Sequence, residues 1–328
     1  MTNHFECVVH LDPKKEMYLQ SKYIFDVAFN PFFSDCLFLV VTYMVKEDKH
    51  LLDKFDFSEY RFVFLVDVAD PPDYQIEKWS VLEHYFDDIK YKVFCIGHIS
   101  NVYTFPTLFI DASSMWSIND RIIYSEYQRE HKKKFTCLTG KMHSHRVDVV
   151  KAIEDNLLSQ CFLSVPHKYH LPSENQTFIN SVVDEIHTRE GICPVSSTIP
   201  LENYQSPVNL VVETSISNSL ILISEKTIKP IFSQQSILLI GNPGSLRLLT
   251  KKYGFKNLSF LPIEIDDERD YKVKIKKFMQ FLETTPLSNL NDMYERNLDS
   301  FAFNKEHLKN FNDISLKYFY QQAEKLIV

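Results

Sequence analysis

Apolar and polar positions alternate in blocks through the second half of the chain. Val208–Val212 and Ser236–Ile240 are continuous apolar runs of the kind that a parallel sheet buries. A polar loop and the segment 224–230 separate the two runs, and a turn at 241–245 follows the second. Strand, helix, strand and helix form the repeating unit of an α/β domain, in which ligands bind at the carboxyl ends of the strands.

The pattern extends on both sides of this core. Phe135–Leu138 predicts a strand, and 147–158 predicts a helix whose apolar positions recur at helical spacing. Ser245 is expected to cap a short helix that ends near Gly254. Further on we expect a strand at 258–260, an amphipathic helix at 271–283, and two helices in the tail 287–328.

The first half of the chain alternates less regularly. Apolar runs predict strands at 7–11, 37–43, 62–66, 92–96 and 107–110, with a helix at 79–86 and another at 125–134. This order indicates a first Rossmann-like half. We therefore expect three parts: an N-terminal Rossmann-like domain over 1–130, a second Rossmann-like domain over 131–285, and C-terminal helices over 286–328.

Composition supports a globular chain. With 328 residues, 45% apolar and 24% charged, it is long enough for two domains with a core each. The net charge of −7 argues against a large nucleic-acid surface. The acidic loop 266–268 and the basic run 272–277 are expected to be solvated.

The six cysteines show no paired spacing, which argues against a disulfide framework and for a reducing compartment. Cys36 and Cys95 lie in apolar runs and are predicted to be buried thiols. The sequence shows no signal peptide, and no apolar run reaches the roughly eighteen residues of a membrane span. These observations predict a cytoplasmic protein without a membrane span.

Two segments resemble a known family. Ser-Glu-Lys-Thr-Ile-Lys-Pro-Ile at 224–231, an apolar strand, Gly-Asn-Pro-Gly-Ser-Leu at 241–246 and Gly-Phe at 254–255 resemble the donor-sugar domain of GT-B glycosyltransferases. The resemblance is to fucosyltransferase-like enzymes and related phage and bacterial proteins. His-Ser-His-Arg at 143–146 is a second anchor, about eighty residues earlier and in the expected order. The match covers about a third of the chain.

This resemblance implies an α/β protein of GT-B type, with two Rossmann-like domains facing across a cleft and C-terminal helices packing back on them. In that group the Thr/Ser-Glu-Lys segment opens the helix that faces the nucleotide sugar. The donor would then bind to the second domain. The resemblance also implies that the first domain supplies the catalytic base.

Arg146 is the strongest single candidate for a residue that binds the donor. It lies at the start of a helix just after a strand, where free N–H groups and the helix dipole favour an anion, and its guanidinium suits a pyrophosphate. Lys141, in the same turn, is expected to assist. The alternative is that Arg146 is a surface residue in a local ion pair.

Glu225 and Lys226 suit a nucleoside diphosphate, since a carboxylate accepts both ribose hydroxyls and an ammonium meets a phosphate. The alternatives are that Glu225 only stabilises the first helical turn, or that it pairs with Lys229 one turn on. Glu213 ends a strand at the ligand-binding edge. The predicted donor-binding residues are Lys141, Arg146, Glu213, Glu225, Lys226, Lys229, Gly241 and Ser245.

An inverting transferase needs a base that removes the proton of the acceptor hydroxyl. The candidates are Asp67, Asp70 and His98, each just beyond an apolar run, and for each the alternative is a turn or surface residue. Arg146 and Lys226 would help the diphosphate to leave. His143 and His145 lack a matching cluster of metal ligands, and no essential metal or cofactor is expected.

The sequence thus predicts a glycosyltransferase that moves a sugar from a nucleotide-sugar donor to a hydroxyl of a glycan, a lipooligosaccharide or a similar acceptor, with inversion and without metal. A nucleic acid is the least favoured acceptor. Two alternatives remain open: another nucleotide-using α/β enzyme, and a glycosyltransferase-like binding or structural protein without turnover.

Overall fold

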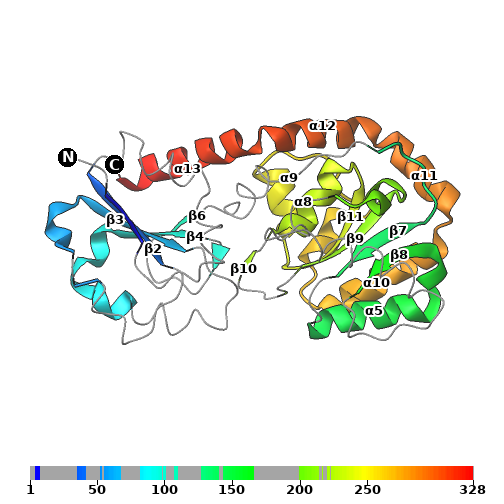
Figure 1. The fold of residues 1–328 in the computed structure, drawn as a ribbon, viewed down its shortest axis with the longest axis horizontal. Coiled ribbons are helices and arrows are strands. Elements are labelled where there is room, and N and C mark those ends of the chain that lie inside the picture. The colour runs from blue at the N-terminus through cyan, green and yellow to red at the C-terminus, as the bar shows by residue number, and fades with distance from the viewer. Residues whose placement is uncertain are drawn as a thin grey trace, which may run out of the picture. The chain divides into compact units, whose positions relative to one another are not determined.

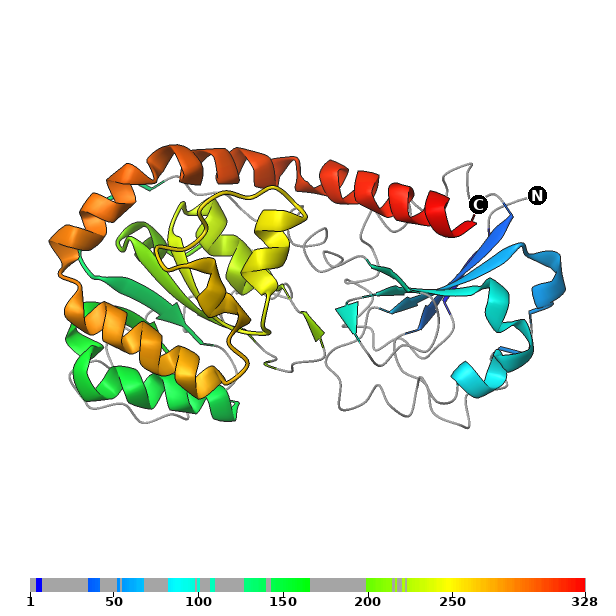
Figure 2. The same ribbon diagram turned by 180° about the vertical axis from the view of Figure 1, so that it is seen from behind.

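The chain is a mixed α/β protein built on parallel sheets (Figures 1 and 2). It divides into two compact units, one made of Met1–Ser117, Ser219–Ile221 and Phe311–Val328, the other of Ile118–Asn218 and Leu222–Asn310. The computed structural model describes residues 4–7, 35–41, 52–53, 55–67, 82–97, 99–100, 107–109, 127–139, 143–165, 199–213, 216, 220–221 and 223–327.

The first unit contains a five-stranded sheet in which all neighbouring strands are parallel. In spatial order its strands are β1 (His4–Cys7), β2 (Cys36–Val41), β3 (Phe62–Asp67), β4 (Val93–Gly97) and β6 (Thr107–Phe109). Leu37, Val63 and Val93 are fully buried, as expected for strands covered on both faces. The same unit holds the 3₁₀ helices η3 (Phe57–Glu59) and η5 (Asp87–Lys92), the antiparallel pair β5 (Ile99–Ser100) and β10 (Leu220–Ile221), and helix α13 (Phe311–Ile327).

Four of the five strands predicted in this half agree with β2, β3, β4 and β6 to within two residues at each end. Cys36 and Cys95 are buried, as their apolar surroundings predict. The strand predicted at 7–11 overlaps β1 only at Cys7, and residues 8–11 lie outside the described residues.

The second unit contains a four-stranded parallel sheet with the order β11, β9, β7, β8. Its strands are β7 (Phe135–Leu138), β8 (Cys161–Ser164), β9 (Val208–Val212) and β11 (Ser236–Ile240). Three of them have the predicted bounds, whereas β8 was not predicted. Val208 pairs with Ser236 and Val212 with Ile240, so β9 and β11 begin and end at the same level.

Helices cover both faces of this second sheet (Figures 1 and 2). On one face α5 (Ser144–Asn156) packs against α10 (Tyr271–Thr284), and on the other lie α8 (Glu225–Phe232), α9 (Ser245–Lys251) and α12 (Leu298–Lys309). Helix α11 (Leu287–Arg296) connects α10 to α12, and the 3₁₀ helices are η6 (Leu158–Gln160), η8 (Leu201–Tyr204) and η9 (Ile263–Asp267). The predicted apolar face of α5 is confirmed, because Val149, Val150 and Ile153 are fully buried.

Three sequence-based expectations for this half are wrong. The tail forms three helices, not two, because α11 and α12 are separate helices that meet at Asn297. Residues 258–260 form no strand: Leu258 O accepts a hydrogen bond from Ile237 N at 2.8 Å, but no ladder follows. Residues 127–134, the described part of the helix predicted at 125–134, are not helical.

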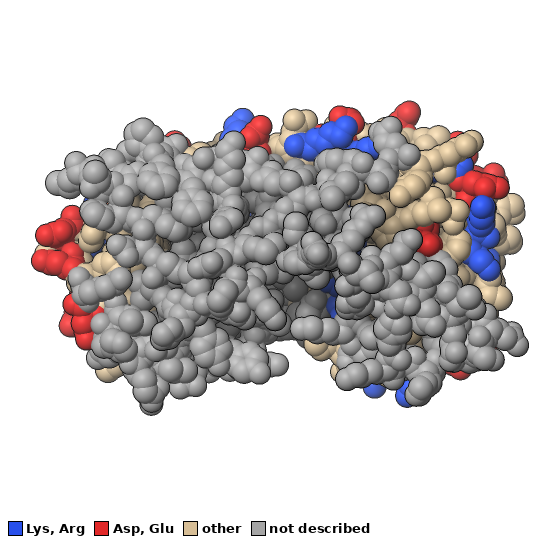
Figure 3. Space-filling model, in the orientation of Figure 1, with Lys and Arg blue, Asp and Glu red and all other residues tan. Residues whose placement is uncertain are grey.

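The surface of the described residues carries both signs of charge on the face that Figure 3 shows. Lys and Arg side chains lie beside Asp and Glu, so this part of the surface forms no continuous basic patch. No helix in the described ranges combines the length and the apolar character needed to cross a bilayer.

The packing of α5 on the sheet gives a test of the core. Ile153 is fully buried, so Ile153→Ala should lower the free energy of unfolding by about 2–5 kcal/mol through lost apolar burial and a residual cavity. Lys151→Ala, on the exposed side of the same helix, should change it by no more than about 0.5 kcal/mol. Urea denaturation of both variants measures the contrast, and equal losses would contradict this packing.

Candidate functional site

The candidate site lies at the carboxyl edge of the second sheet, where β7, β9 and β11 lead to the helices α5, α8 and α9. Parallel strands bring their carboxyl ends to one edge, which is where α/β sheets bind ligands. Glu213 N donates to Ile240 O at 2.9 Å, so the residues that follow β9 and β11 lie side by side.

Glu213 is fully buried, and its carboxylate holds the start of α8. Its Oε1 accepts hydrogen bonds from Ser224 N at 3.0 Å and from Thr227 Oγ1 at 2.6 Å, and its Oε2 accepts one from Ser224 Oγ at 2.5 Å. A negative charge at a helix N-terminus is also stabilised by the helix dipole. Because both oxygens are engaged, Glu213 positions the segment 224–227. The direct donor contact expected for Glu213 stays a prediction.

Gly241 makes room for that carboxylate. A Cβ at residue 241 would lie 3.2 Å from Cγ of Glu213 and 3.3 Å from the side chain of Leu239, closer than ordinary contacts. A larger residue at 241 would therefore require the side chains of Glu213 and Leu239 to shift by a few tenths of an ångström. Gly241 is one of the chain's six glycines and the first residue of the segment 241–246 that belongs to the resemblance.

The start of α5 is bonded to the end of β9. Arg146 Nη2 donates to Val212 O at 3.2 Å, and His145 Nε2 lies 2.9 Å from Glu213 O. Because a carbonyl only accepts, Nε2 of His145 carries a proton. Burial is the main cause of a lowered pKa for His145. Arg146 is only 2% exposed, which excludes the alternative of a surface arginine.

A second buried carboxylate, Asp266, holds the start of α9. Its Oδ2 accepts from Arg247 N at 3.0 Å, and its main-chain oxygen accepts from Gly244 N at 3.1 Å. Lys274 Nζ lies 3.8 Å from Asp266 Oδ1 and 3.4 Å from Gly241 O. Burial raises the pKa of Asp266 and lowers that of Lys274.

This pair corrects the expectation that the acidic loop and the basic run are solvated. Asp267, Lys272, Lys276 and Lys277 are exposed, but Asp266 and Lys274 are 4% and 0% exposed. Lys274 precedes Ile275 and lies one turn before Phe278, on the buried side of α10. The sequence of the basic run does not reveal that Lys274 is buried, because the other lysines of the run lie on the exposed side of α10.

Two of the three helix starts at this edge are therefore occupied by carboxylates of the protein itself, Glu213 at α8 and Asp266 at α9. In helix α5 the N-cap residue, His143, makes no side-chain cap hydrogen bond. The start of α5, with Arg146 in its first turn, is the third helix N-terminus at this edge.

Ser245 does not cap α9 as predicted. The cap is Gly244, whose φ of 82° is in the left-handed region that favours glycine, and Ser245 is the first helical residue. The Ser245 hydroxyl is buried and donates to Asn242 O at 2.7 Å. This hydrogen bond stabilises the turn between β11 and α9.

The other predicted residues divide between the two units. Lys226 is half-buried in the first turn of α8, and Lys229 in the next turn is buried. Glu225 begins α8 and Asp67 ends β3, but both side chains lie outside the described residues, as do all of Asp70, His98 and Lys141. The structure thus brings Arg146, Glu213, Lys226 and Gly241 to one edge.

The sequence reasoning missed several residues that build this edge. Ser224 and Thr227 supply the hydroxyls that Glu213 accepts, and their three-residue spacing at a helix start was a usable signal. His145 was considered as part of the His-Ser-His-Arg anchor and as a metal ligand, and its hydrogen bond to Glu213 O was not foreseen. Its ring stacks on that of His143 at 5.8 Å, and the described ranges contain no group of three or more potential metal ligands.

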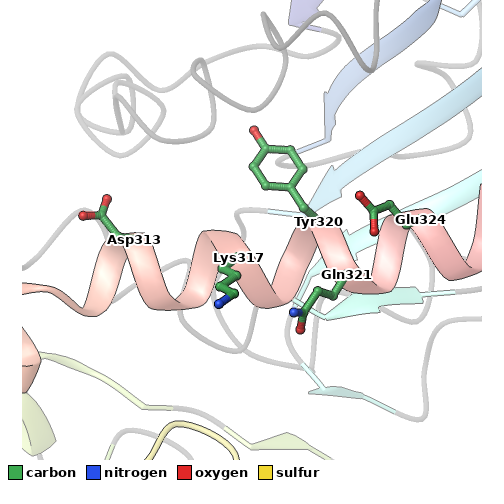
Figure 4. A pocket seen from close by; sticks show the side chains of 5 residues that line it. All are labelled: Asp313, Lys317, Tyr320, Gln321 and Glu324. Atoms are coloured by element: carbon green, nitrogen blue, oxygen red, sulfur yellow. The ribbon is translucent and has the colours of Figure 1, made fainter.

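A pocket of about 460 Å³ lies elsewhere, on α13 of the first unit (Figure 4). Its described lining consists of Asp313, Lys317, Tyr320, Gln321 and Glu324. All five belong to one helix, and none is a predicted site residue.

Comparison with known proteins adds little to this geometry. No protein-family model matches the chain, and neither does any curated protein. A solved alpha1,3-fucosyltransferase is similar at 13% identity and a TM-score of 0.38, over 95% of this chain and 90% of its own. A solved alpha1,3-fucosyltransferase with GDP-fucose is similar at 12% identity and a TM-score of 0.37, over 94% and 91%. Similarity at this level carries no argument about what this chain binds or transfers.

The hold of Glu213 on α8 can be measured. Glu213→Gln removes the negative charge from a site that receives three hydrogen bonds, and should lower the free energy of unfolding by about 1.5–3 kcal/mol. Glu264→Gln, the same change on an exposed residue of η9, should have almost no effect. Urea denaturation compares the two variants, and an unchanged midpoint for Glu213→Gln would refute this role.

The raised pKa of Asp266 gives a pH test. The folded chain holds this proton more tightly than the unfolded chain, so the free energy of unfolding falls as pH rises above the ordinary pKa of 3.8. Asp266→Asn lacks this dependence. The stability of the wild type relative to the variant should therefore be greatest near about pH 4 and decrease toward about pH 7. A difference that stays constant over this range would show that the pKa is not raised.

Proposed function

We propose that this chain is a nucleotide-sugar-dependent glycosyltransferase of GT-B type, acting on a hydroxyl of a glycan, a lipooligosaccharide or a similar acceptor. One observation carries the proposal. The segment 224–227, which resembles the donor segment of that family, starts a helix at the carboxyl edge of a parallel sheet, beside the buried Arg146. Such an edge is where α/β domains bind nucleotides.

In this proposal the donor binds to the second domain, 131–285. Glu225 accepts the ribose hydroxyls, while Arg146, Lys226 and Lys141 meet the diphosphate. Lys229 adds positive charge one turn further along α8, and the turn from Gly241 to Ser245 borders the sugar. Glu213 positions the start of α8 and lies at the same edge as a further donor contact.

The reaction proposed is an inverting displacement. The acceptor oxygen attacks the anomeric carbon, the bond from that carbon to the diphosphate oxygen breaks, and a base takes the hydroxyl proton. The first domain, 1–130, supplies this base from Asp67, Asp70 or His98. Arg146 and Lys226 stabilise the departing diphosphate, a task that a metal ion performs in other transferases.

A glycosyltransferase-like binding or structural protein is the second candidate, and the environment of Arg146 favours it. The side chain is 2% exposed and donates to Val212 O at 3.2 Å, so it already has a structural role. Hydrolysis or transfer of a sugar from a nucleotide sugar by the purified protein separates the two candidates.

The donor site is tested by thermal stability against UDP, GDP, CMP, ADP and NAD. One glycosyl-donor nucleotide should raise the melting temperature, since a ligand at a hundredfold excess over its Kd adds about 2.7 kcal/mol to the stability of the folded state. Lys226→Ala and Glu225→Gln should abolish this shift. Lys276→Ala, which removes an exposed charge on α10, should keep it.

Two other outcomes count against the proposal. Stabilisation by ADP or NAD alone would favour another nucleotide-using enzyme. No stabilisation by any of the five, in a protein with a normal circular dichroism spectrum, would favour the second candidate.

A further inference from the structure

The turn between β11 and α9, residues 241–246, buries most of its surface. Only Pro243 and Gly244 of this turn are half-buried, and its other residues are buried. The turn is stabilised from within, because the Ser245 hydroxyl donates to Asn242 O at 2.7 Å. A ligand at the carboxyl edge of the sheet would therefore meet this turn at Pro243 and Gly244.

Lys274 of α10 contacts the first residue of this turn, and its side chain has no exposed surface. Its Nζ lies 3.4 Å from Gly241 O, and among the described residues this carbonyl is the only hydrogen-bond acceptor of the ammonium. An ammonium has three donors, and away from water it attracts a carbonyl oxygen more strongly than an exposed one does. The contact holds the point where β11 ends and the turn begins.

Asp266 of η9 supplies the opposite charge and holds the other end of the turn. Its Oδ1 lies 3.8 Å from Lys274 Nζ, and its side chain is only 2% exposed. Its main-chain oxygen accepts from Gly244 N, and its Oδ2 accepts from Arg247 N. The two residues therefore reach both ends of the turn, and their charges attract each other.

Stability alone does not account for this buried pair. Taking two charges out of water is costly, and replacing a buried ion pair by neutral side chains of similar size often leaves stability unchanged or raises it. Asp266 Oδ1 also has no hydrogen-bond partner among the described residues, so charge alone joins it to Lys274. What the pair provides, and neutral side chains would not, is a fixed position for Gly241 O.

We propose that Lys274, with Asp266 as its counter-charge, is a positioning residue that fixes the turn 241–246, so that Pro243 and Gly244 present a rigid surface to the sugar of the donor. Lys274 is fully buried and does not touch the donor itself. The role at the sugar rests on the proposed function, whereas the hold on the turn does not. The residues proposed for the diphosphate lie elsewhere, so loosening the turn should affect a nucleotide sugar more than a nucleoside diphosphate.

The test uses the double variant Asp266→Asn/Lys274→Met, which removes both charges and nearly keeps the size of both side chains. The amide oxygen introduced at 266 can still accept from Arg247 N. Each single variant leaves one buried charge unpaired, so each should lower the melting temperature more than the double variant does. A double variant whose loss equals the sum of the two single losses would overturn the pairing.

Hydrogen exchange followed by mass spectrometry then measures the turn itself, without any nucleotide. In the double variant the amides of Gly244 and Ser245 should exchange about tenfold faster than in the wild type, because no ammonium holds Gly241 O. The amides of β9 should keep their rates. Lys276→Met, on the exposed side of α10, is the matched control and should leave the turn unchanged. Unchanged exchange in the turn of the double variant would overturn the proposal, and so would faster exchange throughout the second unit.

Titration calorimetry tests the role at the sugar, with UDP and UDP-glucose as one pair of probes and GDP and GDP-mannose as the other. For the pair that the wild type binds, the double variant should lose about tenfold in affinity for the nucleotide sugar and keep its affinity for the nucleoside diphosphate. Equal losses for both would overturn this role. Binding of none of the four by the wild type would count against the proposed function, and hydrogen exchange would still decide whether Lys274 positions the turn.

Discussion

The hydrogen bonds between the Glu213 carboxylate and the start of α8 are the interaction on which the candidate site depends. The carboxylate fixes Ser224 and Thr227, and with them the backbone of Glu225 and Lys226. Its own position is set by its neighbours, because Glu213 N is bonded to Ile240 O and its side chain lies close to Gly241. A single buried negative charge thus joins three consecutive parts of the βαβ unit.

Charged side chains differ between the two edges of the second unit's sheet. At the carboxyl edge, the buried carboxylates Glu213 and Asp266 occupy the starts of α8 and α9. At the amino edge, Arg129 has aromatic rings around it and no carboxylate among the described residues.

The local pattern of the sequence was enough to predict β7, β9 and β11, because apolar runs between turns are compatible with few structures other than a buried strand. It also led to Arg146 and Glu213, since each is close to the end of such a run. The roles of these residues could not be predicted, because burial and hydrogen bonding depend on segments far apart in the chain. Lys274 and Asp266 illustrate this: each lies among exposed charges of its own sign, and only tertiary packing selects one of them for the interior.

The division of the chain between its two units has a consequence for biosynthesis. The first unit takes Met1–Ser117, then Ser219–Ile221, and finally Phe311–Val328, which contains α13. A ribosome makes the chain from the N-terminus, and domains generally fold as they emerge. All residues of the second unit are therefore synthesised before Phe311–Val328, the last segment of the first unit. The strands of the first unit are thus synthesised before helix α13, which belongs to the same unit.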